Sequence, residues 1–529
     1  MKASFNFRSR NSSEQPQSRF YKWFVLANVM LGTFMAVLDS TIVNVGLPKI
    51  MAAFGVSLDT IQWVVTGYML AMAAMMPTSG WLADKFGYKT IYFLGLFFFT
   101  LGSFFCGISN DEVSLITSRI IQGLGGGIIQ TLGMAIVIRE FPPNQRGLAI
   151  GFWSIASAAS VSFGPLIGGY LIDNFGWQLI FNVNVPVGII ALLFTFIIQR
   201  EVKNPNAKKF DGIGLFSVII FLPVLLYALS EGNAASNSEG WRSPYLLLCF
   251  AISGIALVAF ITQELTTSHP LLNLRLLKNY NFGLGTLFLM IFGMGLSGGT
   301  FMIPLYLQNA MGYTALQAGA VFLPAGIMQG AISPLVGITS DKINPKILIF
   351  TGVSLMALSF YVNTRLSFLS SHSSVMLSLY LRGLGMGIFF TPLSSLTLLS
   401  MPREQIAQAS SIINAMRQIG GSIGIAVMTT MLTARTNFHN QIYGQAINSQ
   451  SQTFRDVTQN LAYNIQAHAG SSFHTAMQQS QMLVASHINT QAFIEGINDC
   501  FMITCLITVV GMIPVFLMRS KKRTAGKSE

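Results

Sequence analysis

Fourteen apolar runs, each about as long as a bilayer is thick, divide this chain of 529 residues. A membrane-spanning helix needs roughly 20 apolar residues. Only 9% of the residues are charged, against about 25% in soluble domains, so a soluble fold would expose large apolar patches. The sequence therefore predicts an all-α integral membrane protein. The expected spans lie near residues 23–46, 60–83, 90–109, 113–138, 147–172, 178–199, 212–230, 244–264, 282–308, 315–339, 346–368, 373–400, 405–433 and 494–518.

Lysine and arginine set the expected orientation of these spans. With the N-terminus in the cytoplasm, the inner segments hold 23 of the 31 basic residues and the outer segments hold five. Cytoplasmic loops carry such an excess, so both termini are expected in the cytoplasm. The net charge of +12 reflects this bias, and we expect no nucleic-acid partner. The polar start leads into a span without a small-residue cleavage site, which favours a first membrane helix over a removed signal peptide.

Two short motifs occur twice in the same order. GWLADKFGYK (80–89) matches GITSDKINPK (337–346), and QGLGGGIIQT (122–131) matches RGLGMGIFFT (382–391). Both copies keep one orientation, which predicts a parallel repeat of two pseudo-symmetric six-helix halves with two inserted helices. The expected parts are a tail (1–22), an N-terminal bundle (23–200), the insertion (201–281), a C-terminal bundle (282–519) and a basic tail (520–529).

The last outer loop, residues 434–492, differs from the others in length and composition. It is rich in Gln, Asn, Ser and His, and apolar residues recur at helical intervals. One or two amphipathic helices outside the membrane and a flexible polar loop are both compatible with this pattern. The four cysteines lie in or beside apolar runs without metal-ligand spacing, so free thiols and no metal or other cofactor are expected.

Asp39, in AVLDSTIVNVGLP, is the acidic residue nearest the middle of a span. A charge at the bilayer centre costs about 2.5–3.5 kcal/mol on insertion scales, and such residues usually face a partner or a cavity. One interpretation is a structural ion pair. The other is a proton-coupling site, in which burial and a nearby cation oppose each other. Arg119 in LITSRIIQGLGGG is the expected cation, at a compatible depth.

Two further segments are candidates for moving parts. The short turn GWLADKFGYK combines glycines for close packing with charges at a helix end. Span 5 contains SFGPLIGGY, whose proline bends a helix and whose glycines permit close contact; it is either a packing kink or a hinge between the halves. The candidate gating residues are Gly80, Asp84, Lys85, Gly87, Lys89 and Asp341, and the candidate hinge residues are Gly164, Pro165, Gly168 and Gly169.

A substrate cavity between the halves is expected to be lined by Phe and Met with few charges. Such walls favour apolar or cationic ligands. The candidate polar lining residues are Asn44, Gln62, Gln130, Asn414 and Arg417.

Together these motifs resemble the major facilitator superfamily, and within it the 14-helix drug:proton antiporters of the EmrB type. LDSTIVNVGLP resembles the first-span motif, with Gly46 where Ala is usual. GWLADKFGYK is similar to the loop motif, with Tyr88 where Arg is common. SRIIQGLGGG resembles the span-4 arginine motif and SFGPLIGGY the antiporter motif of span 5. The resemblance covers essentially the whole chain.

The resemblance implies proton-driven efflux of amphiphilic organic compounds across a bacterial inner membrane. It implies that Asp39 and Arg119 couple protons and that Asp84 belongs to a cytoplasmic gate. It also implies a periplasmic adaptor of the EmrA kind and an outer-membrane channel as partners. A proton-coupled importer, or an exporter of one specific solute, remains an alternative, as does a channel or receptor. No nucleotide-binding loop or nucleophile–base set indicates an enzyme.

Overall fold

The computed structural model describes residues 20–142, 145–203, 211–232, 237, 239–339, 343–398, 401, 406–446, 451–469 and 472–519. Within these ranges all regular secondary structure is helical. Helices are expected in lipid, because each span must satisfy its own backbone hydrogen bonds. Most of the predicted N-terminal tail and all of the C-terminal tail lie outside the described residues.

The N-terminal half of the fold forms one bundle, in which short helices join longer ones on the outer side. Its helices are α1 (Tyr21–Phe54), α2 (Leu58–Ile61), α3 (Trp63–Phe86), α4 (Tyr88–Gly107), α5 (Glu112–Glu140), α6 (Arg146–Phe175), α7 (Leu179–Asn182) and α8 (Asn184–Ile198). The long α1 ends at Gly55, which adopts a left-handed conformation with φ 67° that suits a glycine C-cap.

Two inserted helices and a second bundle follow. The insertion contains α9 (Gly212–Glu231), η1 (Gly240–Arg242), α10 (Pro244–Thr266) and η2 (Leu274–Lys278). The second bundle contains α11 (Tyr280–Leu305), η3 (Tyr306–Ala310), α12 (Ala315–Ala320), α13 (Leu323–Thr339), α14 (Pro345–Val362), η4 (Asn363–Arg365), α15 (His372–Leu398), α16 (Ile406–Ala446), α17 (Gln452–Ala469) and α18 (Phe473–Leu517).

The two bundles repeat the same packing. In the first bundle, α1 packs on α6, α3 and α4 both pack on α5, and α4 also packs on α8. In the second bundle, α11 packs on α16, α13 and α14 both pack on α15, and α14 also packs on α18. A Cβ added to Gly125 would lie 2.5 Å from the carbonyl oxygen of Gly95, and one added to Gly385 would lie 2.7 Å from that of Gly352. The internal repeat read from the sequence is therefore a repeat of close helix contacts.

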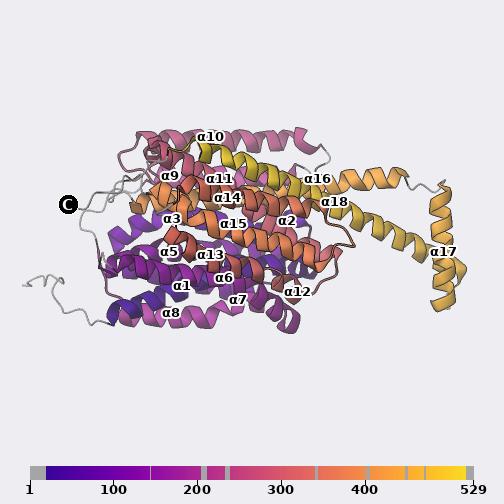
Figure 1. Cartoon of the computed structure of the whole chain (residues 1–529), viewed down its shortest axis with the longest axis horizontal. Coiled ribbons are helices and arrows are strands. Elements are labelled where there is room, and N and C mark those ends of the chain that lie inside the picture. The colour runs from indigo at the N-terminus through magenta and orange to yellow at the C-terminus, as the bar shows by residue number, and fades with distance from the viewer. Residues whose placement is uncertain are drawn as a thin grey trace, which may run out of the picture.

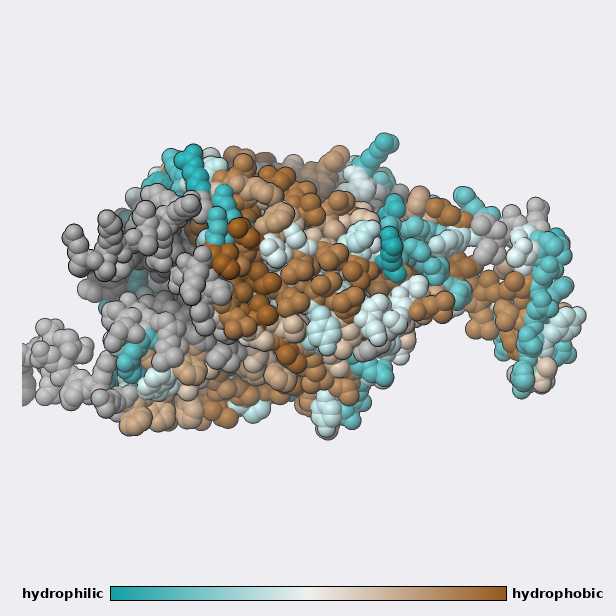
Figure 2. All heavy atoms as spheres, in the orientation of Figure 1, coloured by the Kyte–Doolittle hydropathy of each residue, from teal (hydrophilic) through white to brown (hydrophobic). Residues whose placement is uncertain are grey.

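Each of the fourteen expected spans coincides with helical segments. Eleven helical segments in the described part of the chain are long and apolar enough to cross a membrane, and α3, α6 and α16 are not among them. Figure 2 shows an apolar band over the bundle, with polar residues towards its right end and on the projecting helices. The start of α1 and the end of α18 lie at the same end of the bundle (Figure 1).

Within the expected outer loop, the described segments 434–446, 452–469 and 473–492 are helical. Helix α16 continues through Ala446 and α18 begins at Phe473, so both project beyond the bundle, and α17 crosses their far end (Figure 1). Arg435 on α16 pairs with Asp499 on α18 at 2.6 Å, and His439 lies 2.9 Å from the same carboxylate. This ion pair ties the base of the projection together. We call α17 and the projecting parts of α16 and α18 the outer hairpin.

The inserted helices cover one flank of the bundle. Helix α9 packs on α10, on α16 of the second half and on α3 of the first. Leu222 and Leu226 of α9 join Ile412 and Ala415 of α16 in a buried apolar cluster. The insertion therefore bridges the two halves on one side.

Candidate functional site

Asp39 and Arg119 form an ion pair inside the N-terminal half. Asp39 lies on α1 and Arg119 on α5, and neither side chain is exposed to solvent. Arg119 Nη1 donates to Asp39 Oδ2 at 2.5 Å. The two residues are 80 positions apart in the chain. The sequence predicted that they lie at compatible depths in the membrane, but it left open whether they touch.

Two amides complete the surroundings of the Asp39 carboxylate. Gln122 Nε2 and Asn184 Nδ2 donate to Asp39 Oδ1 at 2.8 and 2.9 Å. Gln122 also accepts from Arg119 Nη1 at 2.5 Å and donates to Ser103 Oγ at 2.5 Å. The four helices α1, α4, α5 and α8 therefore meet at this one carboxylate.

Arg119 is fixed by more than its carboxylate. Its Nε donates to the carbonyl oxygen of Val64 at 2.9 Å. Its guanidinium carbon lies 4.0 Å from the ring centre of Tyr68 and 5.5 Å from that of Phe181. An arginine over an aromatic face gains a cation–π attraction that grows when water is excluded. The Arg119 guanidinium is thus held by a backbone carbonyl and two aromatic rings as well as by Asp39.

This arrangement surrounds the buried Asp39 carboxylate with one cation and two amide donors. A buried carboxylate is stabilised by an adjacent cation and by donors to both oxygens. Removing one partner of such a pair leaves an uncompensated charge, at a cost of about 3–5 kcal/mol.

The short turn between α3 and α4 is held by a residue that the sequence did not single out. The Glu201 carboxylate accepts from the backbone N–H of Lys89 and of Thr90 at 3.1 and 3.0 Å, at the N-terminus of α4. A carboxylate is stabilised there by the free N–H groups and the helix dipole. Gly87 has φ 111° and packs against Glu201, so this position requires glycine.

The other expected gating residues have local contacts. Asp84 accepts from the Tyr88 hydroxyl at 3.2 Å, and exposed Lys85 lies 4.8 Å from the Trp81 ring centre. A Cβ added to Gly80 would meet no atom of the described residues within 4 Å. Asp341, in the second copy of the motif, lies outside the described residues.

The glycines of α6 pack in two directions. Gly164 and Gly168 lie against Thr41 and Ile42 of α1, within the first half. Gly169 lies against the backbone of Ala315, and Gly319 lies against the carbonyl of Pro165, so α6 and α12 touch across the two halves. The SFGPLIGGY segment therefore combines an internal packing face with a contact between the halves.

Asp173 reinforces that contact at the outer end of α6. Its Oδ1 and Oδ2 accept from the backbone N–H of Ala315 and Leu316 at 3.2 and 2.8 Å. These are the first two residues of α12, where N–H groups lack partners within the helix. Nearby, Gln308 Nε2 donates to the carbonyl oxygen of Val45 at 2.8 Å, again from the second half to the first. The two halves are therefore closed against each other on the outer side.

Comparison with known proteins agrees with this architecture. The family model described as Major Facilitator Superfamily matches residues 29–425. The chain belongs to the major facilitator superfamily. A bacterial homologue of the human lysosomal transporter Spinster, solved in an inward-facing and unoccupied conformation, superposes with a TM-score of 0.64 at 16% identity. That likeness covers 95% of this chain and 97% of the other and concerns the fold.

The curated relatives of this superfamily member include multidrug exporters. It is 31% identical to the multidrug export protein EmrB of Haemophilus influenzae over 90% of this chain and 91% of that protein. The EmrB of Escherichia coli K12 is 30% identical over 91% and 92%. An uncharacterized MFS-type transporter of Bacillus subtilis, YhcA, is 33% identical over 94% and 93%. These proteins are transporters, so the transporter class holds for this chain.

The five expected cavity residues of this superfamily member lie on several different elements. Gln62 is buried and donates to the carbonyl oxygen of Asp59 at 3.0 Å, in the outer segment between α1 and α3. Asn44, Gln130, Asn414 and Arg417 are half-buried on three different helices. Only Asn414 and Arg417 share a helix, α16, where they are less than one turn apart.

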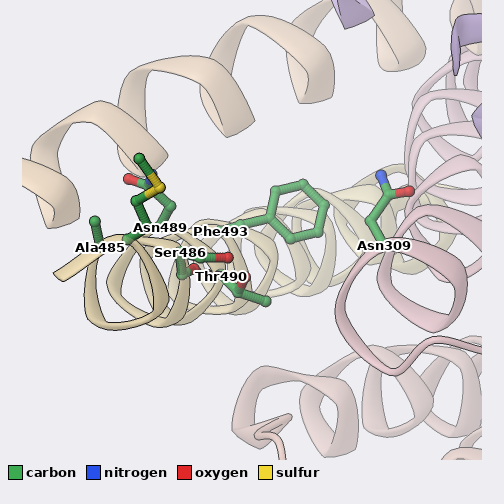
Figure 3. Close-up of a pocket in the computed structure, with 7 residues that line it drawn as sticks. Asn309, Ala485, Ser486, Asn489, Thr490 and Phe493 are labelled. Carbon is green, nitrogen blue, oxygen red and sulfur yellow. Dashed lines mark hydrogen bonds between the residues drawn. The ribbon is translucent and has the colours of Figure 1, made fainter. Parts of the chain in front are cut away.

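A groove opens where the outer hairpin leaves the bundle. It has a volume of about 470 Å³ and lies between η3 and α18. Figure 3 shows Asn309 facing Phe493 across it, with Thr490, Ser486, Asn489 and Ala485 farther along α18. The groove is polar at several points and faces the outer side.

Gln122, Asn184 and Glu201 are the site residues that the sequence reasoning missed. Gln122 follows Arg119 by three residues, so both lie on one helix face, and this spacing was a usable signal. Asn184 is 145 residues from Asp39 in the chain. Glu201 is 112 residues from Lys89 and 111 from Thr90. Spacing along one helix cannot reveal such partners.

Proposed function

We propose that this chain is a proton-coupled antiporter that exports amphiphilic or hydrophobic organic compounds by alternating access. The observation that carries the proposal is the sealed pair of Asp39 and Arg119 in a transporter similar to multidrug export proteins. A buried ionisable pair inside a span marks proton pathways in many transporters.

In the proposed cycle, Asp39 gains a proton when it loses its bond to Arg119, and it loses the proton when that bond forms again. Protonation from the outer side would neutralise Asp39, release Arg119 and loosen α1 from α5. Loss of the proton to the cytoplasm would restore the ion pair. Since α1 also packs on α6, and α6 contacts α12 of the other half, the state of the pair can bias the closure between the halves.

The direct test is pH-driven efflux in membrane vesicles that carry Asp39→Asn. The variant keeps the shape of the side chain and removes its charge, so proton-driven transport should fall to background. Asp456→Asn is a matched control, because Asp456 lies on α17 outside the bundle and accepts a hydrogen bond from Gln452 of its own helix. Full proton-driven efflux by Asp39→Asn, at normal membrane abundance, would contradict the proposal.

A proton-coupled importer with the same fold is the second candidate. The closed outer side is compatible with either direction, because each half-cycle passes through such a state. Substrate flux in vesicles of known orientation distinguishes the two, since antiport moves substrate against the inward flow of protons.

We further propose that the protein lies in a bacterial inner membrane with fourteen spans and both termini in the cytoplasm. The outer hairpin would then lie in the periplasm, where an adaptor of the EmrA kind could join it to an outer-membrane channel. Helix α17 suits such a contact, because exposed Val457 and Tyr463 interrupt its polar surface.

Site-specific crosslinking tests the adaptor. A photoreactive residue at Tyr463 should crosslink to a co-expressed adaptor, and one at Phe97, which is exposed on α4 within the membrane, should not. Equal crosslinking at both positions, or none at Tyr463, would exclude docking at α17. Protease access to a tag at either terminus tests the orientation.

A further inference from the structure

Arg417 lies between the two halves near the middle of α16. Gly421, one turn farther out on the same face, packs against Met69 of α3, and its Cβ would lie 2.7 Å from Ser297 Oγ of α11. Gln418 donates to Met72 Sδ of α3 at 3.7 Å. The backbone of Arg417 faces Gly293 of α11, whose Cβ would lie 2.5 Å from its carbonyl oxygen. This face of α16 therefore looks into the junction of α3, α11 and α16.

Among the described residues, the Arg417 guanidinium has no counter-ion. It makes no hydrogen bond, ion pair or ring contact within the part of the chain that the structure describes. The span arginine of the first half, Arg119, instead pairs with Asp39. Arg417 is also half-buried rather than sealed, so a molecule that enters between the halves can reach it.

No described carboxylate of the spans is available to Arg417. Asp39 is fully buried and already bound to Arg119, Gln122 and Asn184. Glu264 belongs to the inserted helix α10 and accepts from the backbone N–H of Leu272. A half-buried guanidinium loses part of its hydration without gaining an anion, which is costly and favours an anionic ligand.

The surroundings of Arg417 suit the apolar body of such a ligand. Met69 and Met72 lie on the α3 side, and half-buried Met290 and Met294 lie on α11. Methionine side chains are flexible and polarisable and adapt to ligands of different shape. Asn414, less than one turn inward and also half-buried, adds a neutral hydrogen-bonding group.

We propose that Arg417 binds the anionic head of an amphiphilic substrate, so that organic carboxylates and sulfonates with apolar bodies are the preferred class. This inference rests on the proposed export function and replaces the expectation of cationic ligands from wall composition. A membrane potential that is negative inside acts on a charged substrate and drives an anion outward. Proton entry and anion exit therefore move charge in the same sense.

Binding of two matched probes tests the inference. 1-Anilinonaphthalene-8-sulfonate and N-phenyl-1-naphthylamine share one ring skeleton and differ in the sulfonate. Equilibrium dialysis against the full chain in lipid nanodiscs, with empty nanodiscs as the blank, gives both affinities. The wild-type protein should bind the sulfonate more tightly than the neutral amine. Loss of a charge-assisted bond in Arg417→Gln should weaken sulfonate binding about tenfold or more and leave amine binding within about twofold.

Two further variants show whether charge is the cause. Arg417→Lys keeps the charge and should retain most of the preference for the sulfonate. Arg365→Gln removes the same charge from an exposed outer position and should leave both affinities unchanged. Equal affinities of the wild-type protein for the two probes would overturn the inference without any variant. The inference would also be overturned if Arg417→Gln still preferred the sulfonate to the same degree, or if it lost affinity for both probes equally.

Transport separates this inference from the proposed function. Proteoliposomes with an imposed pH gradient should accumulate the sulfonate faster than the amine, and Arg417→Gln should reverse the order. Proton-driven transport of both probes with an unaltered ratio in Arg417→Gln contradicts the role of Arg417 and leaves the antiporter standing. Selective sulfonate binding with no proton-driven transport supports the role of Arg417 and contradicts the antiporter.

Discussion

Three arginines, Arg119, Arg382 and Arg417, lie inside expected spans, and their surroundings in the structure differ. Arg119 has a carboxylate, Arg417 is open to a ligand, and Arg382 is sealed. Arg382 is 3% exposed, and Nε, Nη1 and Nη2 all lack a hydrogen-bond partner among the described residues. Its guanidinium carbon lies 4.8 Å from the Phe360 ring centre. By the repeat, Arg382 and Phe360 occupy the positions of Gln122 and Ser103, so the second half has lost this hydrogen-bonded pair.

Arg→Met substitutions at Arg382 and Arg119 should change stability in opposite directions. Arg382→Met removes an uncompensated buried charge at similar volume, which should stabilise the protein by about 1–3 kcal/mol. Arg119→Met leaves Asp39 buried without its cation and should destabilise it by about 3–5 kcal/mol. Thermal unfolding in detergent measures both. A lower midpoint for Arg382→Met would show that Arg382 is stabilised by a partner, such as an ordered water.

At the scale of elements, the closure between the halves depends on short helices. Helix α12 has six residues and begins with a capping box formed by Thr314 and Gln317. That box holds the helix start in place for Asp173 of the other half. The geometry resembles an ordinary N-cap, except that the Asp173 carboxylate, which accepts from the first N–H groups of α12, belongs to the other half. Opening of the halves must therefore break these hydrogen bonds.

Asp173→Asn should weaken the outer closure. An amide keeps only one acceptor and loses the attraction to the start of α12, a loss of roughly 1 kcal/mol, or severalfold in population. With the four native cysteines replaced, a cysteine introduced at Leu316 should react severalfold faster with a membrane-impermeant maleimide. Asp111→Asn is the matched control, because Asp111 caps α5 within one half. Equal rates in Asp173→Asn and the control would contradict the latch.

At the scale of the whole molecule, one acidic contact joins all three parts. Asp59 on α2 is hydrogen-bonded to Thr433 on α16 and lies near Glu231 at the end of α9. Burial, and then repulsion from Glu231, raise the pKa of Asp59 to about 6. The first half, the insertion and the second half therefore meet at an outer group that titrates near neutral pH.

The raised pKa gives the sign of a pH effect. Because folding raises the Asp59 pKa from about 3.9 to about 6, the folded state binds the proton more readily in that window. The Asp59 contribution to stability therefore falls as pH rises from about 4 to about 6. Asp59→Asn should unfold at a higher temperature than the wild type at pH 7, and the difference should shrink towards pH 4. A constant difference across this range would contradict the assignment.

Much of the architecture was readable from the sequence. Apolar runs predicted where helices lie, because lipid excludes any span with unpaired backbone groups. Repeated motifs predicted two halves, and the helix contacts of Gly95 with Gly125 and of Gly352 with Gly385 repeat accordingly. At Gly80, by contrast, a Cβ would meet no neighbour among the described residues. A glycine shows that contact is permitted, and not that a neighbour is present.

The sequence by itself determined that the chain is a helical membrane protein with a charged residue, Asp39, deep in its first span. Composition and charge bias report how each segment transfers from water into lipid. That transfer depends on the segment itself and not on distant parts of the chain. Only the tertiary structure decided that Asp39 meets Arg119, Gln122 and Asn184 and that Asp173 joins the halves. It also decided that Arg417 has no partner in the part of the chain that the structure describes. The rotation of each helix about its axis decides these contacts, and that rotation depends on packing against distant segments.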